Sequence, residues 1–235
     1  MLLLCCLGGC RSTPLHPTPA GSVLSAGKEE EPALGPHQVA DVQIAMGHSL
    51  EKQGGLEEAR TAYLEALNQD PERADAYERL AVVSYRLGKS DEGEEWCQKA
   101  QRGGKSTADL HCNQGYSQYL RGHWDEAEKS LLWALVHDSG HRCAHNNLGL
   151  VLAQMGRNEA ALAEFRKASC SEVEAYTNLG FALTLKGDWS AAQAQYGKAL
   201  AADPSFAQAK EGLRRVRALQ AQAARSAGGA PARGE

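Results

Sequence analysis

The stretch Asn146–Ala168, NNLGLVLAQMGRNEAALAEFRKA, places two similar segments on either side of Gly156. Leu and Ala occur in both segments and Glu in the second, and these residues favour helix, whereas glycine disfavours the interior of a helix. The stretch is therefore typical of two helices joined by a turn at Gly156. The rest of the chain decides whether this hairpin is repeated or belongs to an ordinary helical bundle.

Glycine returns at nearly the same interval along most of the chain. The spacings are 34, 34, 34 and 31 residues, for Gly54, Gly88, Gly122, Gly156 and Gly187. A small residue also stands seven positions before each of these glycines: Gly47, Ala81, Gly115, Gly149 and Gly180. Further small residues stand five and twelve positions after each of them. A fixed period of this length is the sequence signature of a repeat protein.

The pattern resembles the tetratricopeptide repeat (TPR), a helix-turn-helix unit of 34 residues, and the resemblance covers residues 40 to 206 as five units. It implies an all-α fold, a right-handed superhelical solenoid of antiparallel helix pairs. Small side chains would let the paired helices approach closely, and the glycine between them would accept a left-handed conformation. The fourth unit is three residues short, at KASCSEVEAY, so we expect its second helix or its turn to be truncated.

Composition and pattern divide the chain into five segments. Residues 1–10 are a predicted lipoprotein signal, and 11–38 are a disordered tether rich in Pro, Ser and Gly. Residues 39–206 are the five repeats, 207–224 a capping helix and 225–235 a disordered tail. Leu213, Val216 and Leu219 share one side of the capping helix and are expected to cover the last repeat.

The first ten residues, MLLLCCLGGC, resemble the signal peptide of bacterial lipoproteins, with Leu7-Gly8-Gly9-Cys10 as the lipobox. The resemblance implies cleavage before Cys10 and a lipid on its sulfur, which would tether the protein to a membrane surface. The stretch lacks the usual Lys or Arg and is short, which a start codon placed too late would explain. We expect a bacterial envelope protein, anchored in the outer membrane and facing the periplasm. The alternative is a disordered N-terminus with incidental cysteines.

Several classes of function are disfavoured. A net charge of -4 provides no clustered positive charge for nucleic acid. The sequence contains no GxSxG motif, no phosphate-binding loop and no catalytic pair of carboxylates, so we predict no enzyme, no cofactor and no small-molecule substrate. The histidines of HDSGHRCAHNN, residues 137–147, match no established zinc spacing, so we predict no metal site.

The resemblance to the TPR family implies that the first helix of each unit lines a concave groove. Position 6 of this helix is asparagine in three successive units, and asparagine can both donate and accept hydrogen bonds to the backbone of an extended peptide. The resemblance also places positions 2, 5, 9, 12 and 13 of this helix in the groove, and positions 9 and 12 add larger apolar and aromatic side chains. The predicted groove residues are Asn113, Asn147, Asn178, Tyr85, Tyr116, Tyr119, Leu150 and Phe181.

Two alternatives remain open for this groove. NLG is a common consensus string of the family, and some of the aromatic side chains, Tyr116 above all, would equally pack between adjacent first helices. Positions 2 and 5 carry Lys or Arg in family members that bind acidic C-terminal peptides. They carry neither here, which makes such a peptide a poor candidate ligand.

Four cysteines lie in the repeats: Cys97, Cys112, Cys143 and Cys170. Outside the cytoplasm, bridges from Cys143 to Cys170 and from Cys97 to Cys112 are conceivable. The alternative is four buried thiols that act as small hydrophobic side chains.

Together these features predict a membrane-anchored adaptor that binds a protein or peptide in its groove. The acylated N-terminus, the five repeats and the shortened unit FRKASCSEVEAYTNLGFAL resemble the lipoproteins that assist Tad/Flp pilus assembly and secretion. Two alternatives remain: an outer-membrane lipoprotein of a type IV pilus secretin or β-barrel assembly complex, and a structural spacer without a groove ligand.

Overall fold

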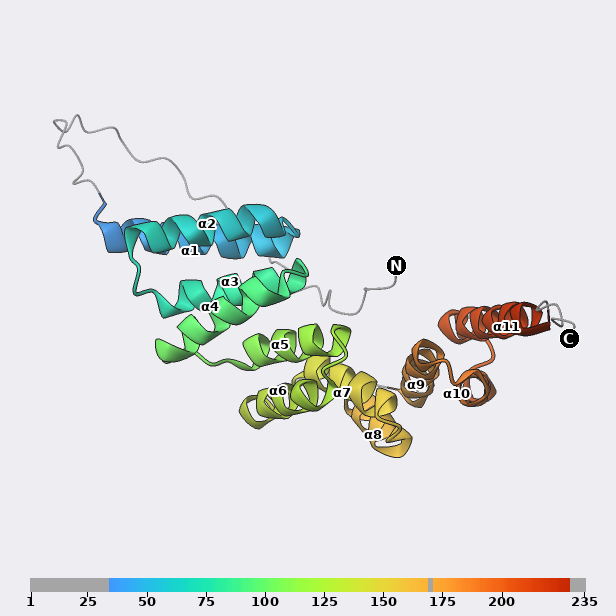
Figure 1. The fold of residues 1–235 in the computed structure, drawn as a ribbon. Coiled ribbons are helices and arrows are strands. Elements are labelled where there is room, and N and C mark those ends of the chain that lie inside the picture. The colour runs from blue at the N-terminus through green and yellow to red at the C-terminus, as the bar shows by residue number, and fades with distance from the viewer. Residues whose placement is uncertain (1–33, 169–170, 229–235) are drawn as a thin grey trace, which may run out of the picture.

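The computed structural model describes residues 34–168 and 171–228, and within these ranges it is entirely helical. Successive antiparallel helix pairs stack in chain order along a curved path, from the α1–α2 pair at one end to α11 at the other (Figure 1). The predicted all-α solenoid of five hairpins and a terminal helix is confirmed. The helices are α1 Pro36–Gln53, α2 Leu56–Gln69, α3 Ala74–Arg86, α4 Ser90–Arg102, α5 Ala108–Leu120, α6 Trp124–His137, α7 Arg142–Gln154, α8 Asn158–Ala168, α9 Glu172–Lys186, α10 Trp189–Ala202 and α11 Ala207–Gly228.

The five periodic glycines form the turns of the hairpins. Their φ angles lie between 76° and 85°, in the left-handed region that residues with a Cβ adopt only at a cost. Gly104 has the same conformation, with φ of 80°, in the turn between α4 and α5. The predicted role of the periodic glycines is therefore confirmed, and one further left-handed glycine lies outside the period.

In four of the five hairpins a glycine of the first helix faces a large side chain of the second helix. A Cβ built on Gly47 would lie 2.5 Å from the ring of Tyr63, and one on Gly149 would lie 2.6 Å from the ring of Phe165. The second hairpin reverses the arrangement, because Tyr85 of α3 packs against Gly93 of α4 at 2.6 Å. Close approach thus needs one small residue per contact, on either helix.

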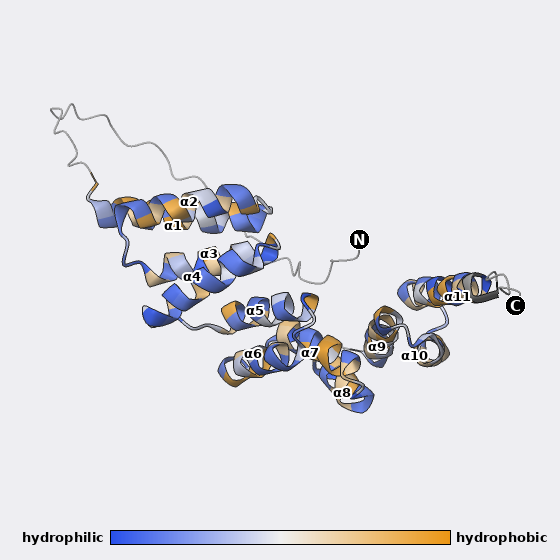
Figure 2. Cartoon of the chain, in the orientation of Figure 1, coloured by the Kyte–Doolittle hydropathy of each residue, from blue (hydrophilic) through white to orange (hydrophobic). Residues whose placement is uncertain are grey.

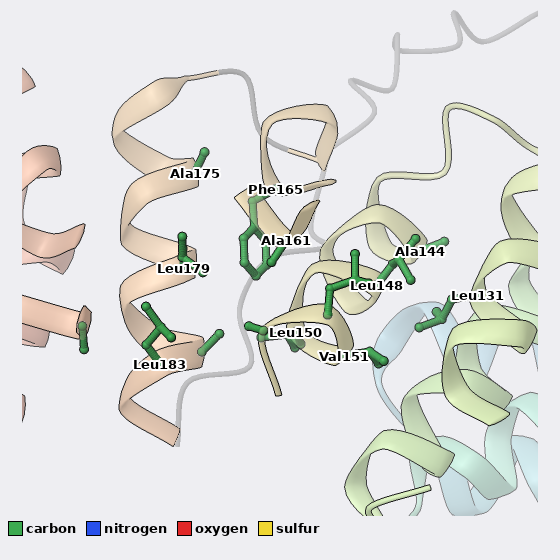
Figure 3. Packing of buried hydrophobic residues seen from close by; sticks show 14 of the residues in the cluster. Leu131, Ala144, Leu148, Leu150, Val151, Ala161, Phe165, Ala175, Leu179 and Leu183 are labelled. Atoms are coloured by element: carbon green, nitrogen blue, oxygen red, sulfur yellow. The ribbon is translucent and has the colours of Figure 1, made fainter. Parts of the chain in front are cut away.

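Buried apolar side chains fill the space between helices, and hydrophilic and hydrophobic residues alternate along each helix (Figure 2). Phe165 of α8, fully buried, lies with Ala161 between labelled residues of α7 and of α9 (Figure 3). No helix among the described residues is long and apolar enough to span a bilayer.

The segment boundaries differ from the sequence-based ones at both ends. Helix α1 begins at Pro36, inside the predicted tether 11–38, because proline is well suited to the first position of a helix. Helix α11 runs to Gly228, inside the predicted tail 225–235, through residues rich in Ala, Gln and Arg that favour helix. The predicted signal, with the lipidation residue Cys10, lies outside the described residues.

The terminal helix and the short fourth repeat follow the prediction. Helix α11 packs against α10 and α9 with Val216 buried and Leu213 and Leu219 partly buried on the same side. Gly212 also lies against the ring of Tyr196, a contact that the apolar pattern did not indicate. Helix α8 has 11 residues, whereas the other second helices have 13 or 14.

Candidate functional site: the concave face

The odd-numbered helices form the concave side of the solenoid. Helices α3, α5, α7, α9 and α11 contact one another in succession, whereas no even-numbered helix packs closely against the next among the described residues. A stack that is closer on one side than on the other curves toward that side. Residues exposed on α3 to α9 therefore share one concave face.

The three predicted asparagines lie half-buried on successive odd helices. The Asn113 amide donates to the Asp109 carbonyl one turn earlier, at 2.8 Å. The Asn147 amide instead reaches Cys112 Sγ on the preceding odd helix, at 3.5 Å. Asn178 likewise reaches the Oδ1 atom of Asn146, at 3.4 Å. Each of the three side chains retains its carbonyl oxygen and a second N–H for further hydrogen bonds.

Two of the predicted aromatic side chains form a stacked pair beside the first asparagine. The rings of Tyr116 and Tyr119 are 6.1 Å apart with an interplanar angle of 21°, and both residues are partly exposed. Burial raises the pKa of the Tyr119 hydroxyl, so this group is neutral and can donate a hydrogen bond at physiological pH.

The other predicted groove side chains are less accessible. Tyr85 is 7% exposed, packs against Gly93 and hydrogen-bonds Glu94 at 3.0 Å, so the structure places it within the second hairpin and not on the open face. Burial, followed by Coulomb interactions with Cys97 and Glu94, raises the pKa of its hydroxyl far above 10. Leu150 is 8% exposed, and Phe181 is partly exposed.

Two exposed leucines on the odd helices were not among the predicted residues. Leu120 is 63% exposed near the tyrosine pair on α5, and Leu185 is 50% exposed on α9. Both occupy position 13 of their repeat, which the family resemblance places in the groove. A leucine at position 13 could have identified both residues from the sequence, but the predicted groove residues were taken only from positions 6, 9 and 12.

At the other end of the concave face, charged side chains link α1 to α3. The Glu51 carboxylate accepts hydrogen bonds from Arg79, Arg86 and the Tyr63 hydroxyl. Burial of Tyr63, together with its bond to Glu51, raises the pKa of that hydroxyl above its usual value. Glu51 is 8% exposed, so the polar cluster is part of the packed structure.

The histidine-rich segment does not converge on one point. Nδ1 of His145 lies 2.6 Å from Glu164 Oε2 and its Nε2 lies 3.0 Å from the Ser139 carbonyl. His137 stacks on Trp133, and His141 contacts Asp109 at 2.9 Å. In the ranges that the structure describes, no three His, Cys, Asp or Glu side chains are arranged to hold a metal ion.

The cysteines differ from both simple expectations. Cys97 and Cys112 are buried free thiols, so the prediction of a disulfide between them is wrong. Each fills its own helix interface as a small apolar side chain. Cys143 is disulfide-bonded, so the alternative prediction of four free thiols is also wrong. Its predicted partner, Cys170, lies outside the described residues.

Comparison with known families identifies the repeat. The sequence model of the tetratricopeptide repeat matches residues 44–107 and 112–172, and a second model of the same description matches 173–206. The chain belongs to the tetratricopeptide repeat family. TPR folds serve as scaffolds for protein–protein interaction, so the concave face is a candidate surface for a protein or peptide partner.

Solved TPR structures share this fold at low sequence identity. YrrB, described as a TPR protein with an unusual peptide-binding site, has a TM-score of 0.56 at 24% identity and covers 73% of this chain and 90% of its own. PilF of Pseudomonas aeruginosa has a TM-score of 0.56 at 23% identity, covering 82% and 89%. PilW, a type IV pilus biogenesis factor, has a TM-score of 0.57 at 18% identity, covering 83% and 96%. No curated protein sequence matches the chain significantly.

Proposed function

We propose that this TPR protein is an adaptor that binds an extended segment of a partner protein across α5, α7 and α9. The observation that supports this most directly is the row Asn113, Asn147 and Asn178 on three successive odd helices, beside the stacked pair of Tyr116 and Tyr119. Each asparagine has a free carbonyl oxygen and a second N–H, which suit the alternating donors and acceptors of a peptide backbone.

The aromatic and apolar surroundings favour the same occupant. Partly exposed tyrosine rings and the exposed Leu120 and Leu185 can cover apolar side chains of the bound segment and exclude water from the amide hydrogen bonds. Backbone hydrogen bonds give affinity that depends little on sequence, while the apolar contacts add selectivity. The described peptide-binding site of YrrB supports this use of the fold.

We further propose that the adaptor is anchored by a lipid on Cys10 and acts in the bacterial envelope, at the outer membrane facing the periplasm. In this proposal it assists assembly of a secretion or pilus machine of the Tad/Flp kind. The lipobox-like LGGC and the tether-like sequence after it support anchoring. The shared fold of PilF and PilW supports a pilus-related role.

That same likeness favours one second candidate, a role in a type IV pilus, because PilW is described as a biogenesis factor of that system. Tad/Flp and type IV pili would supply different partners. Crosslinking the tethered protein in its native membrane, followed by mass spectrometry, distinguishes the two by the proteins recovered.

The groove is tested by the double variant Asn147→Ala with Tyr119→Ala in the same crosslinking experiment. We expect it to lose most of the recovered partner while its helical circular dichroism stays unchanged, because both side chains are partly exposed. The matched control is Lys129→Ala with Val136→Ala, two exposed residues of the even-numbered helix α6. Equal recovery with both variants would leave a structural spacer as the better account.

Anchoring is tested separately by Cys10→Ala. The full chain is expected in the membrane fraction, and the variant in the soluble fraction. Membrane retention of the variant would contradict the lipid anchor without affecting the groove proposal.

A further inference from the structure

Helices α1 and α3 do not pack closely against each other on the concave face, unlike the later pairs of odd helices. A pocket of about 290 Å³ lies there, lined by His48, Glu51, Lys52 and Arg79. Arg79 occupies position 6, the position of Asn113 in the next repeat, so the pocket lies one repeat before the asparagine row.

The Glu51 carboxylate in this pocket is already fully bonded. Its Oε1 atom accepts from the Tyr63 hydroxyl at 2.7 Å and from Arg79 Nε at 3.0 Å. Its Oε2 atom accepts from Arg79 Nη2 at 2.5 Å and from Arg86 Nη1 at 3.2 Å. A carboxylate has about four acceptor sites. Glu51 therefore fixes both guanidinium groups in place and has no acceptor site left for a ligand.

The pocket retains unused positive charge. Arg86 is not a lining residue but pairs with the lining Glu51, so two guanidinium groups face this one carboxylate. Lys52 is exposed and forms no ion pair with any described residue. The Arg86 side chain is 41% exposed and uses one of its five N–H donors on Glu51. Its remaining planar donors suit a second carboxylate.

A second carboxylate that interacts with Arg79 and Arg86, that of Asp109, does not remove this excess of positive charge. A hydrogen bond from His141, and then the charges of Arg79 and Arg86, lower the pKa of Asp109. Asp109 is thus ionised and held by His141 of the next repeat. Counting Glu51 and Asp109 against Lys52, Arg79 and Arg86 still leaves a net positive charge without any contribution from His141.

We propose that this pocket binds acidic side chains of the partner segment that runs along the concave face, with Arg86 and Lys52 as the contacting cations. This deepens the proposed function, since it assigns an acidic stretch to the part of the partner that lies over α1 and α3. The sequence argument against acidic ligands considered only positions 2 and 5. Here the cations come from position 6, for Arg79, and from position 13, for Lys52 and Arg86.

The test measures fluorescence polarisation of a labelled peptide with four consecutive glutamates between Gly-Ser segments, against the same peptide with four glutamines. We expect the full-length protein to bind the glutamate peptide more tightly. The variant Lys52→Gln with Arg86→Gln should weaken that binding by about tenfold, as expected for the loss of two exposed charge contacts. Binding should also weaken with added salt.

The matched control is Arg121→Gln, whose side chain is 46% exposed and pairs with the single carboxylate of Asp91 outside the pocket. It should bind the glutamate peptide as the unaltered protein does. We expect the double variant to keep the thermal unfolding midpoint of the unaltered protein, because the ion pair between Arg79 and Glu51 remains in it. An unchanged midpoint would show that the fold is intact.

Three results would overturn the inference. The first is equal affinity of the protein for the glutamate and the glutamine peptide. The second is an affinity of the double variant for the glutamate peptide equal to that of the unaltered protein. The third is displacement of the glutamate peptide by inorganic phosphate at the same concentration as the peptide, which would indicate a site for free anions. None of them concerns Asn147 or Tyr119. If partner recovery still depends on those two residues, the acidic pocket alone is wrong and the groove proposal stands.

Discussion

The first two repeats, α1–α4, and the remainder of the chain, α5–α11, share one sequence period but are held together differently. In α5–α11 a single apolar cluster runs continuously from Cys112 to Val216. In the first region the buried apolar residues form two separate clusters. One contains Tyr63 and Leu80, and the other contains Tyr85 and Cys97 and extends to Leu110 of α5.

Ion pairs add to the apolar contacts between the first two repeats, which share the cluster that contains Tyr63 and Leu80. Arg60 pairs with Glu92 at 2.8 Å, Lys89 with Glu57 at 2.7 Å, and Glu51 holds Arg79 and Arg86. The outer ends differ too, since α11 covers the last repeat while α1 exposes Val42 and Met46. The repeat pattern therefore specifies each hairpin and leaves open how strongly neighbouring hairpins are coupled.

The largest expected effect comes from cutting the continuous cluster. Phe165→Ala removes a fully buried ring that lies between three helices, which should cost about 3–5 kcal/mol. In hydrogen exchange measured by mass spectrometry, protection should fall throughout α5–α11 and change little in α1 and α2. An equal fall in all eleven helices would show that the two regions unfold as one and would remove the contrast.

The next effect tests the polar link in the first region. Glu51→Gln keeps the shape and the contact with Tyr63 but leaves Arg79 without its carboxylate, so we expect a loss of about 1–3 kcal/mol. Exchange should rise in α1–α4 alone. Glu128→Gln, which faces the exposed Arg157 in the second region, is the control and should cost about 1 kcal/mol or less. A larger loss for the control would contradict the comparison.

A smaller loss of stability is expected from substitutions at the turns, and it should be the same in both regions because their turns do not differ. Gly88→Ala and Gly122→Ala place a Cβ in open space but at φ of 76° and 78°, which should cost about 1–2 kcal/mol each through backbone strain. Gly197→Ala, in an exposed part of α10, should instead stabilise by about 0.5–1 kcal/mol. Thermal unfolding of the three variants checks the sign and size.

The smallest effect concerns the two free thiols. Burial, followed by the charge of Glu94, raises the pKa of the Cys97 thiol to about 11, so the folded protein holds almost no Cys97 thiolate at pH 8. Alkylation then requires opening, and Cys97 of the first region should react before Cys112 of the continuous cluster. Peptide mapping after timed iodoacetamide labelling measures the order, and faster labelling of Cys112 would contradict it.

The hairpins and their turns could be predicted because each depends on residues close in sequence. Gly156 and Gly149 suffice to place a turn and a close helix contact, and both are as expected. The groove was predicted less well. Position 12 suggested that Tyr85 is exposed, but Gly93, the small residue on the opposite helix, opened a space inside the hairpin that the ring fills.

The charged pocket could not be predicted from the pattern either. Glu51 lies in the first repeat and Arg79 and Arg86 lie in the second, and their meeting depends on how one hairpin is rotated against the next. The same is true of Asn147 and Cys112, whose contact joins two odd helices.

The sequence by itself determined the number of hairpins, their turns and the small residues that bring paired helices together, because these are local requirements of chain geometry and side-chain volume. The tertiary structure alone decided which repeats share an apolar core, where the polar links lie and which side chains stay open on the concave face. Those features depend on contacts between separate hairpins, and a repeat period does not encode the orientation of one hairpin against its neighbour.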